Sequence, residues 1–416
     1  MGNNRQDLNL LDLGILLIKN ITCINSQVKQ AFQKFNIIQY FNEIYDKYVL
    51  DTDFMKNLIL CMGHFVNSRF GDDNILCIIK IIKSQLNNNL SLELLFRYVF
   101  ILYNLSYYNN PKIYEEMIKN EIQKDFMKIY PFKEDNLNVN KNLETNKDDN
   151  SIEIIKENDK DICYERELRI IILKILGKIM SSENKAIIQS IIDSDIANFL
   201  NKVFQSTDDI KIIKNVFFCL SNICSGTLGQ ITNLYVNHTI FEAFKVAQYV
   251  YDTLDSNNKF VNSAKSNNYI KAFRESNFFI SLCIINSLYD KIMPYVRNQN
   301  YSIVKILLKG LLFFDEDSIN DENKNLILFI LNAISKLNKY ENNDDEEEII
   351  MSYSIKFKEF LDKNGFKEIL EKLQLNPDDN IVTTAENLYD ELYDDGNIIN
   401  EDINIDDIIE DFKNDE

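Results

Sequence analysis

Apolar residues recur every three or four positions along almost the whole chain, and this spacing places them on one face of an α-helix. The clearest stretches are ILCIIKIIKSQL, LELLFRYVFILYNL, LRIIILKILGKIM, NFFISLCIINSLYDKIM and LILFILNAISKL. No sustained stretch alternates with a period of two, and the apolar runs are longer than ordinary strands. The pattern therefore predicts an all-α chain.

Two stretches fall outside this pattern. Residues 131–160 are polar and almost free of aromatic side chains, which predicts a disordered or looping insertion. Residues 396–416 form an acidic tail whose isoleucines could dock as a short helix on a partner. We therefore expect helical repeats in residues 1–130, the insertion, further repeats in residues 161–395, and the tail.

Two segments in the second half of the chain repeat the same order: a long helix, a turn of small residues, a short helix and another helix. Lys178 and Asn222 occupy the same place in these segments, 44 residues apart, which fits the roughly 40 to 47 residues of armadillo and HEAT repeats. Earlier in the chain, Asn20, His64 and Asn104 follow at intervals of 44 and 40 residues. The interval from Asn104 to Lys178 is 74 residues and contains the polar insertion, so we expect one interrupted unit there.

The formal net charge of −19 and the isoelectric point near 4.7 narrow the classes of partner. Such a charge repels phosphate backbones and anionic lipid and attracts cationic peptides or proteins, so nucleic acid is not an expected partner. The excess of acidic residues is explained equally well by a need to keep the protein soluble. No apolar run approaches about 18 residues and no signal-peptide pattern opens the chain, so we expect an intracellular protein without membrane insertion.

The chain offers little to a catalytic or metal site. Its seven cysteines are scattered singly, which is typical of small buried side chains in a reducing compartment. Its only histidines are His64 and His238, which leaves few ligands for a zinc site. Glycine-rich phosphate loops and the G-x-S-x-G and H-E-x-x-H motifs are missing, and the acidic runs are contiguous and solvated. We expect no enzyme activity, no metal and no cofactor.

Several phrases resemble one family in order and spacing. KNVFFCLSNICSG resembles EACWTISNITAG, VFILYNLSYYNNP resembles TWTLSNLCRGKNP, LKILGKIMSS resembles LRAVGNIVTG, and the segment from Gly365 to Asp395 resembles a terminal repeat followed by an acidic tail. These are features of the importin-α family, the armadillo-repeat adaptors of nuclear import, and the likeness covers roughly residues 10–130 and 165–395. It implies an armadillo-repeat solenoid with a right-handed superhelical path.

The family places tryptophan and asparagine four residues apart on the inner helix of successive units, where they line a concave groove. The indoles hold lysine and arginine stems, and the amides bind the backbone of an extended peptide. In this sequence the tryptophan places fall on Leu16, Leu60, Phe100, Phe218 and Phe278, and the asparagine places on Asn20, His64, Asn104, Asn222 and Leu282. The cargo-peptide-binding residues implied by the resemblance are Asn20, Phe100, Asn104, Phe218, Asn222 and Phe278.

The resemblance implies an adaptor of the cytoplasm and nucleus that binds basic nuclear localisation signals on cargo proteins. It also implies an exportin partner at the C-terminal repeat and acidic tail, and it leaves direct binding of importin-β open.

An armadillo scaffold for protein partners, without signal binding, is the alternative. The chain has no tryptophan, its first 35 residues carry only four basic side chains in place of a basic segment, and aromatic residues at helical spacing are often core residues. The N-terminus is expected to be either truncated or that of a divergent relative.

Overall fold

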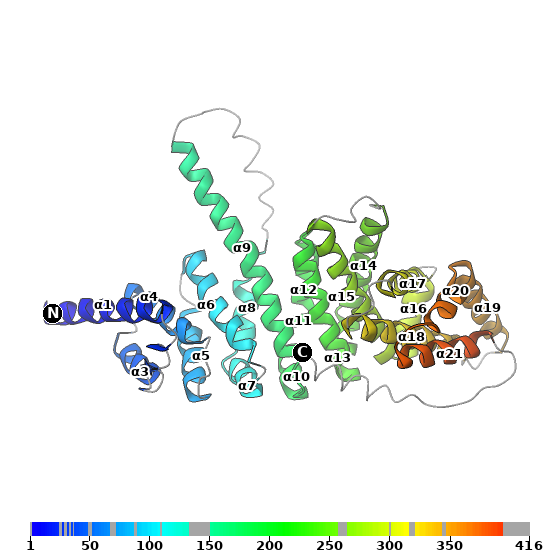
Figure 1. The fold of residues 1–416 in the computed structure, drawn as a ribbon, viewed down its shortest axis with the longest axis horizontal. Coiled ribbons are helices and arrows are strands. Elements are labelled where there is room, and N and C mark those ends of the chain that lie inside the picture. The colour runs from blue at the N-terminus through cyan, green and yellow to red at the C-terminus, as the bar shows by residue number, and fades with distance from the viewer. Residues whose placement is uncertain are drawn as a thin grey trace. The chain divides into compact units, whose positions relative to one another are not determined.

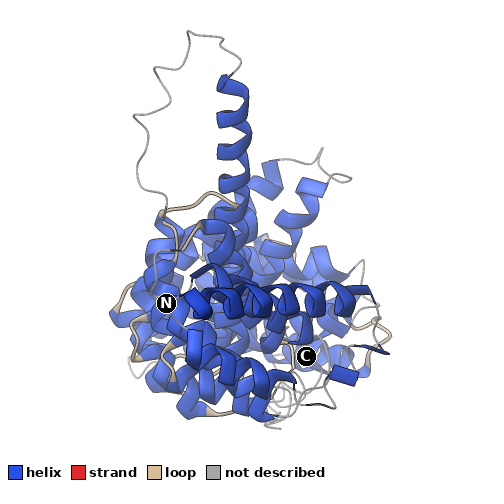
Figure 2. Ribbon diagram, turned by 90° about the vertical axis from the view of Figure 1, so that its left-hand side faces the viewer, coloured by secondary structure: helices blue, strands red, loops and turns tan. Residues whose placement is uncertain are grey.

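The described part of the chain is entirely helical. The computed structural model describes residues 2–393 except 25–26, 29–30, 33–34, 36, 49–51, 67–71, 87–89, 109, 133–149, 257–263, 299–300, 316–320 and 343–346. Helices and loops, without a strand, make up these residues (Figures 1 and 2). The all-α prediction is confirmed.

The chain divides into two compact units, residues 1–194 and residues 195–416. The helices of the first unit are α1 (Gly2–Ile24), α3 (Ile37–Tyr48), α4 (Thr52–Val66), α5 (Asp72–Leu86), α6 (Leu92–Ser106), α7 (Pro111–Lys119), α8 (Ile122–Ile129), α9 (Asn150–Met180) and α10 (Lys185–Ile192).

The second unit continues the series with helices of similar length. They are α11 (Ile196–Gln205), α12 (Ile210–Cys224), α13 (Leu228–Val236), α14 (Thr239–Ser256), α15 (Ala264–Asn286), α16 (Tyr289–Asn298), α17 (Ser302–Asp315), α18 (Asp321–Asn342), α19 (Glu347–Lys363), α20 (Phe366–Leu373) and α21 (Asp379–Tyr393).

From α6 onward the helices follow a period of three. In the first unit α6 packs on α9, and in the second unit α12 packs on α15, α15 on α18, and α18 on α21. Along the chain, two further helices separate each of these from the next. This order is the three-helix repeat of armadillo proteins, and we call α6, α9, α12, α15 and α18 the third helices.

Side chains next to the helix ends explain where several helices begin. The hydroxyl of Ser91 accepts from the backbone N–H of Leu94 at the start of α6, and Asn110 and Asn184 cap α7 and α10 in the same way. The Asp209 carboxylate accepts from the N–H of Lys211 at 2.9 Å and begins α12. These caps satisfy backbone donors that would otherwise have no partner, so the sequence itself sets these boundaries.

Left-handed residues stand at equivalent junctions of the repeats. Glu121 joins α7 to α8 with a φ of 55°, His238 joins α13 to α14 with 55°, and Tyr301 joins α16 to α17 with 57°. Asp195, immediately before α11, has a φ of 70°, and Gly365, before α20, has 72°. Only the last is a glycine, the residue that adopts this conformation without strain, so packing between helices imposes the turn at the other four.

The structure differs from one detail of the expected organisation. Helix α9 begins at Asn150, inside the range in which we expected a loop, while residues 133–149 of that range lie outside the described residues. The acidic tail also lies outside them. Among the described helices, none is long and apolar enough to cross a membrane.

Candidate functional site

Helix α6 carries the first aromatic and asparagine pair that the resemblance indicated. Phe100 has 42% of its surface exposed, and Asn104, one turn later, is half-buried. Residues four apart share a helix face, and the helix residues around them, including Val99, Ile101 and Leu105, are buried. The structure thus places both predicted side chains on the outward stripe of a third helix.

The same stripe of α6 is aromatic along its length. The rings of Phe96 and Phe100 stack with centroids 6.0 Å apart, and Phe100 lies 6.0 Å from Tyr103. Tyr103 meets Tyr107 edge to face at 4.9 Å, and their hydroxyls are 2.6 Å apart. That hydrogen bond, together with partial burial, raises the pKa of Tyr107. Four rings at intervals of three and four residues therefore form a continuous surface beside Asn104.

Helix α9 adds lysines to this aromatic surface. The Lys174 Nζ donates to the Tyr103 hydroxyl at 3.3 Å and lies 5.3 Å from the centroid of that ring. The Lys178 Nζ lies 5.8 Å from the centroid of the Tyr107 ring. These are cation–π distances, so the chain's own ammonium groups lie over the faces of the Tyr103 and Tyr107 rings. We call this surface, made of Phe96, Phe100, Tyr103, Asn104, Tyr107, Lys174 and Lys178, the α6/α9 face.

Helix α12 carries the second pair, Phe218 and Asn222. Both side chains are half-buried, whereas Phe217 and Cys219 are fully buried in the core. Burial raises the pKa of the Cys219 thiol, and the charge of the nearby Glu275 adds to this effect. The outward stripe of α12 thus consists of Phe218 and Asn222, following two half-buried lysines, Lys211 and Lys214.

An acidic side chain from α15 lies near this stripe. The Glu275 carboxylate is 3.7 Å from the Lys214 Nζ, and its side chain keeps 13% of its surface exposed. The carboxylate thus lies at the Lys214 end of the stripe, where it can accept from the ammonium group of a lysine. Sequence reasoning missed Glu275, because it lies 57 residues after Phe218 and comes near only through the packing of α15 on α12.

The remaining predicted positions are less uniform. Phe278 is only 7% exposed, because the Phe329 ring of α18 packs edge to face against it at 6.0 Å. Leu282 is 5% exposed. In the first unit, Asn20 is exposed on α1, and His64 is half-buried on α4. The structure therefore leaves Phe100 exposed and Phe218 half-buried, and it covers Phe278.

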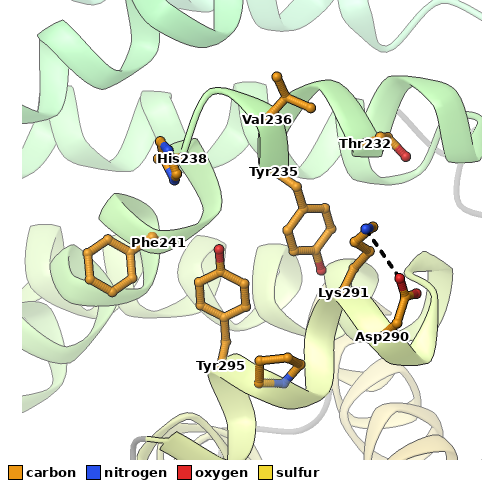
Figure 3. Close-up of a pocket in the computed structure, with 9 residues that line it drawn as sticks. Thr232, Tyr235, Val236, His238, Phe241, Asp290, Lys291 and Tyr295 are labelled. Atoms are coloured by element: carbon orange, nitrogen blue, oxygen red, sulfur yellow. Dashed lines mark ion pairs between the residues drawn. The ribbon is translucent and has the colours of Figure 1, made fainter.

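A pocket of about 850 Å³ lies away from the third helices, between α13 and α16 in the second unit (Figure 3). Tyr235, Phe241 and Tyr295 form its aromatic walls, and an ion pair of 3.2 Å between Lys291 and Asp290 stands at its edge. Figure 3 shows the Tyr295 hydroxyl directed toward the open space. No motif in the sequence marked this pocket, since its walls come from two different repeats.

The cysteines mostly occupy core positions. Cys61, Cys219, Cys224 and Cys283 are buried, whereas Cys163 is exposed near the start of the described side chains of α9. In the part of the chain that the structure describes, three or more histidine, cysteine, aspartate or glutamate side chains do not gather into a metal-binding group.

Comparisons with known proteins give structural neighbours only. No protein-family model and no curated protein matches the chain. A designed armadillo repeat protein in complex with the peptide (KR)4 is 15% identical, with 76% of this chain and 99% of that chain covered and a TM-score of 0.48. A second designed armadillo repeat protein is 15% identical over 75% and 98% of the two chains, with a TM-score of 0.48.

An engineered protein is 14% identical over 92% of this chain and 95% of its own, with a TM-score of 0.47. With TM-scores below 0.5, these likenesses add no argument about what the chain binds. By its own helix order and by the packing of its third helices, the chain is an armadillo-type α-helical repeat protein.

Proposed function

We propose that this chain is a peptide-binding adaptor whose second unit holds a basic signal peptide along α12, as the nuclear import adaptors it resembles do. The observation that supports this most directly is the pairing of Phe218 with Asn222 on the outward stripe of a third helix. The acidic Glu275, on the neighbouring third helix, lies close to the same stripe.

Each of the three side chains would have a separate role. The Asn222 amide can donate to and accept from the backbone of an extended peptide. The Phe218 ring would cover the stem of a lysine, with a weaker cation–π attraction than an indole gives. Glu275 would exchange its present partner, Lys214, whose Nζ lies 3.7 Å away, for the ammonium group of the peptide.

The resemblance extends the proposal to partners and location. We propose that the adaptor carries proteins with nuclear localisation signals between cytoplasm and nucleus, and that its C-terminal repeat and acidic tail bind an exportin. Helices α19 to α21 form the described part of that repeat. Imaging the tagged protein in cells with exportin blocked tests this point, since a cycling adaptor should accumulate in the nucleus.

The binding proposal is tested by titrating a labelled basic bipartite signal peptide into the full chain at low and moderate salt. We expect saturable binding that Asn222→Ala weakens roughly fivefold, which corresponds to about 1 kcal/mol for one hydrogen-bonding group. Asn380→Ala, an exposed asparagine on α21, is the matched control and should bind as the wild type does. Absence of saturable binding, or equal affinity of the Asn222→Ala chain, would contradict the proposal.

A scaffold that binds partners without recognising basic signals is the second candidate. The observation that favours it is the pair of lysines on the α6/α9 face, where a basic peptide would meet like charge. The same titration separates the two candidates, because a scaffold of this kind leaves the basic peptide unbound.

A further inference from the structure

We propose that the α6/α9 face of the first unit is a docking surface for an acidic, partly apolar segment of a partner protein. This inference goes beyond the basic peptide proposed for the second unit. It rests on residues of the first unit alone, and it assigns a ligand of opposite charge.

The α6/α9 face carries positive charge that the carboxylates of its own helices do not compensate. Every carboxylate of α6, and every carboxylate of α9 from Ile162 onward, is engaged by an arginine of the same helix. The pairs are Arg97–Glu93, Arg166–Glu167 and Arg169–Glu165. Lys174 and Lys178 are both half-exposed, and neither has a carboxylate partner among the described residues. The surface is therefore locally cationic on a chain whose net charge is −19.

The rings of α6 hold the two lysines of the α6/α9 face in place. Lys174 donates to the Tyr103 hydroxyl, and both ammonium groups lie over tyrosine rings of α6. A lysine held against a ring loses less conformational freedom when a ligand binds than a lysine extended into water. Each Nζ has three donors, and the contacts made here leave donors for an incoming carboxylate. The geometry thus presents two positioned anion-binding groups one helical turn apart.

The α6/α9 face also offers apolar and amide surface beside the two lysines. Phe96 and Phe100 supply stacked rings, and Phe100 is 42% exposed. Asn104 lies on the same stripe and can bind a peptide backbone. Exposed aromatic surface beside unpaired charge is typical of interaction sites, because it combines apolar burial with charge complementarity. An extended segment with carboxylates and aliphatic side chains matches all of these features.

The test uses the full chain and a short labelled peptide in which glutamate alternates with leucine. The same peptide with glutamine in place of glutamate is the ligand control. We expect saturable binding of the acidic peptide that weakens as salt is raised, because exposed ion pairs are screened, and at least about tenfold weaker binding of the glutamine peptide.

Lys174→Glu combined with Lys178→Glu should weaken binding of the acidic peptide at least about tenfold, which is equivalent to about 1.4 kcal/mol. The matched control is Lys245→Glu combined with Lys119→Glu, which makes the same change in net charge. Lys245 also lies over a ring, that of Phe241 at 3.9 Å, but on α14 of the second unit, and Lys119 is 76% exposed on α7. This control should keep wild-type affinity, and circular dichroism would establish that both variants are folded.

The proposal would be overturned by no saturable binding of the acidic peptide, by equal loss in the control variant, or by equal affinity for the glutamine peptide. Binding seen only when the chain ends at Tyr393 would also overturn it, since the chain's own acidic tail would then be the occupant. Binding of the basic signal peptide should not fall in the Lys174→Glu, Lys178→Glu chain. A failure here can therefore be told apart from a failure of the proposed function.

Discussion

The buried ion pair of Arg297 and Glu341 gives a stability prediction that can be worked from the structure. Glu341, near the end of α18, is 0% exposed. Its carboxylate accepts from the Arg297 guanidinium, with 2.6 Å between the closest nitrogen and Oε2, and from the Tyr301 hydroxyl at 3.2 Å. Burial alone would lower the pKa of Arg297, but the hydrogen bond and charge of Glu341 outweigh it and raise that pKa. The pair thus fixes the end of α16 to α18.

Replacing Arg297 with methionine keeps most of the side-chain volume and leaves a buried carboxylate without its cation. Breaking a buried pair in this way destabilises proteins by about 3 to 5 kcal/mol. Removing both charges with Arg297→Met and Glu341→Leu avoids the isolated charge and costs only the hydrogen bonds that Tyr301 and Tyr289 make with the pair, at about 1 to 3 kcal/mol. We therefore expect the double variant to be more stable than the single variant.

Urea unfolding followed by far-ultraviolet circular dichroism measures these differences as free energies of unfolding. Arg274→Met is the matched control, because its partner, Glu322, is 59% exposed and such pairs contribute about 1 kcal/mol or less. The reasoning would be refuted if Arg297→Met lost no more than this control. It would equally be refuted if the double variant were less stable than Arg297→Met alone.

Four further substitutions test three other features. Asp195→Gly and His238→Gly should each raise the free energy of unfolding by up to about 1 kcal/mol, measured by urea titration, because glycine adopts a positive φ without strain. Gly310→Ala should lower it by about 1 kcal/mol, because a Cβ on α17 would meet Oδ1 of the buried Asn277 at 2.5 Å, and this crowding exceeds the gain in helix propensity. Burial lowers the pKa of Lys336 in the folded protein. The charged side chain therefore destabilises the fold fully at pH values below its pKa in the folded state, and this destabilisation disappears as the pH rises to its pKa in the unfolded state. Lys336→Met should therefore gain more stability relative to the wild type at pH 7 than at alkaline pH, and an unchanged difference would contradict this assignment.

Much of the fold could be predicted from local sequence patterns. The spacing of three and four between apolar residues predicts the helices, because a helix has 3.6 residues per turn and one face must be buried. Capping residues such as Ser91 and Asp209 mark helix starts, since they satisfy donors within their own turn. The interval of 44 residues between Lys178 and Asn222 indicated the repeat, and the three-helix order bears this out.

The residues with left-handed backbone conformation between helices could not be predicted in this way. Glycine normally marks such a turn, but Asp195, His238 and Tyr301 occupy it here. Each is held in a strained conformation by the packing of the helices that it joins. Local preference therefore predicts the wrong backbone at these positions, and only the assembled repeat shows where one helix turns into the next.

The sequence by itself determined which residues stand at each helix position, including the pairs of phenylalanine and asparagine on α6 and α12. Only the tertiary structure decided what these residues face. Phe100 and Phe278 have the same chemistry and similar spacing, yet Phe100 is 42% exposed and Phe278 is 7% exposed, because Phe329 of α18 covers the latter. Lys174 reaches the ring of Tyr103 across 71 residues of sequence. Exposure and charge at a surface depend on neighbours that are distant in the chain, and a local pattern contains no information about them.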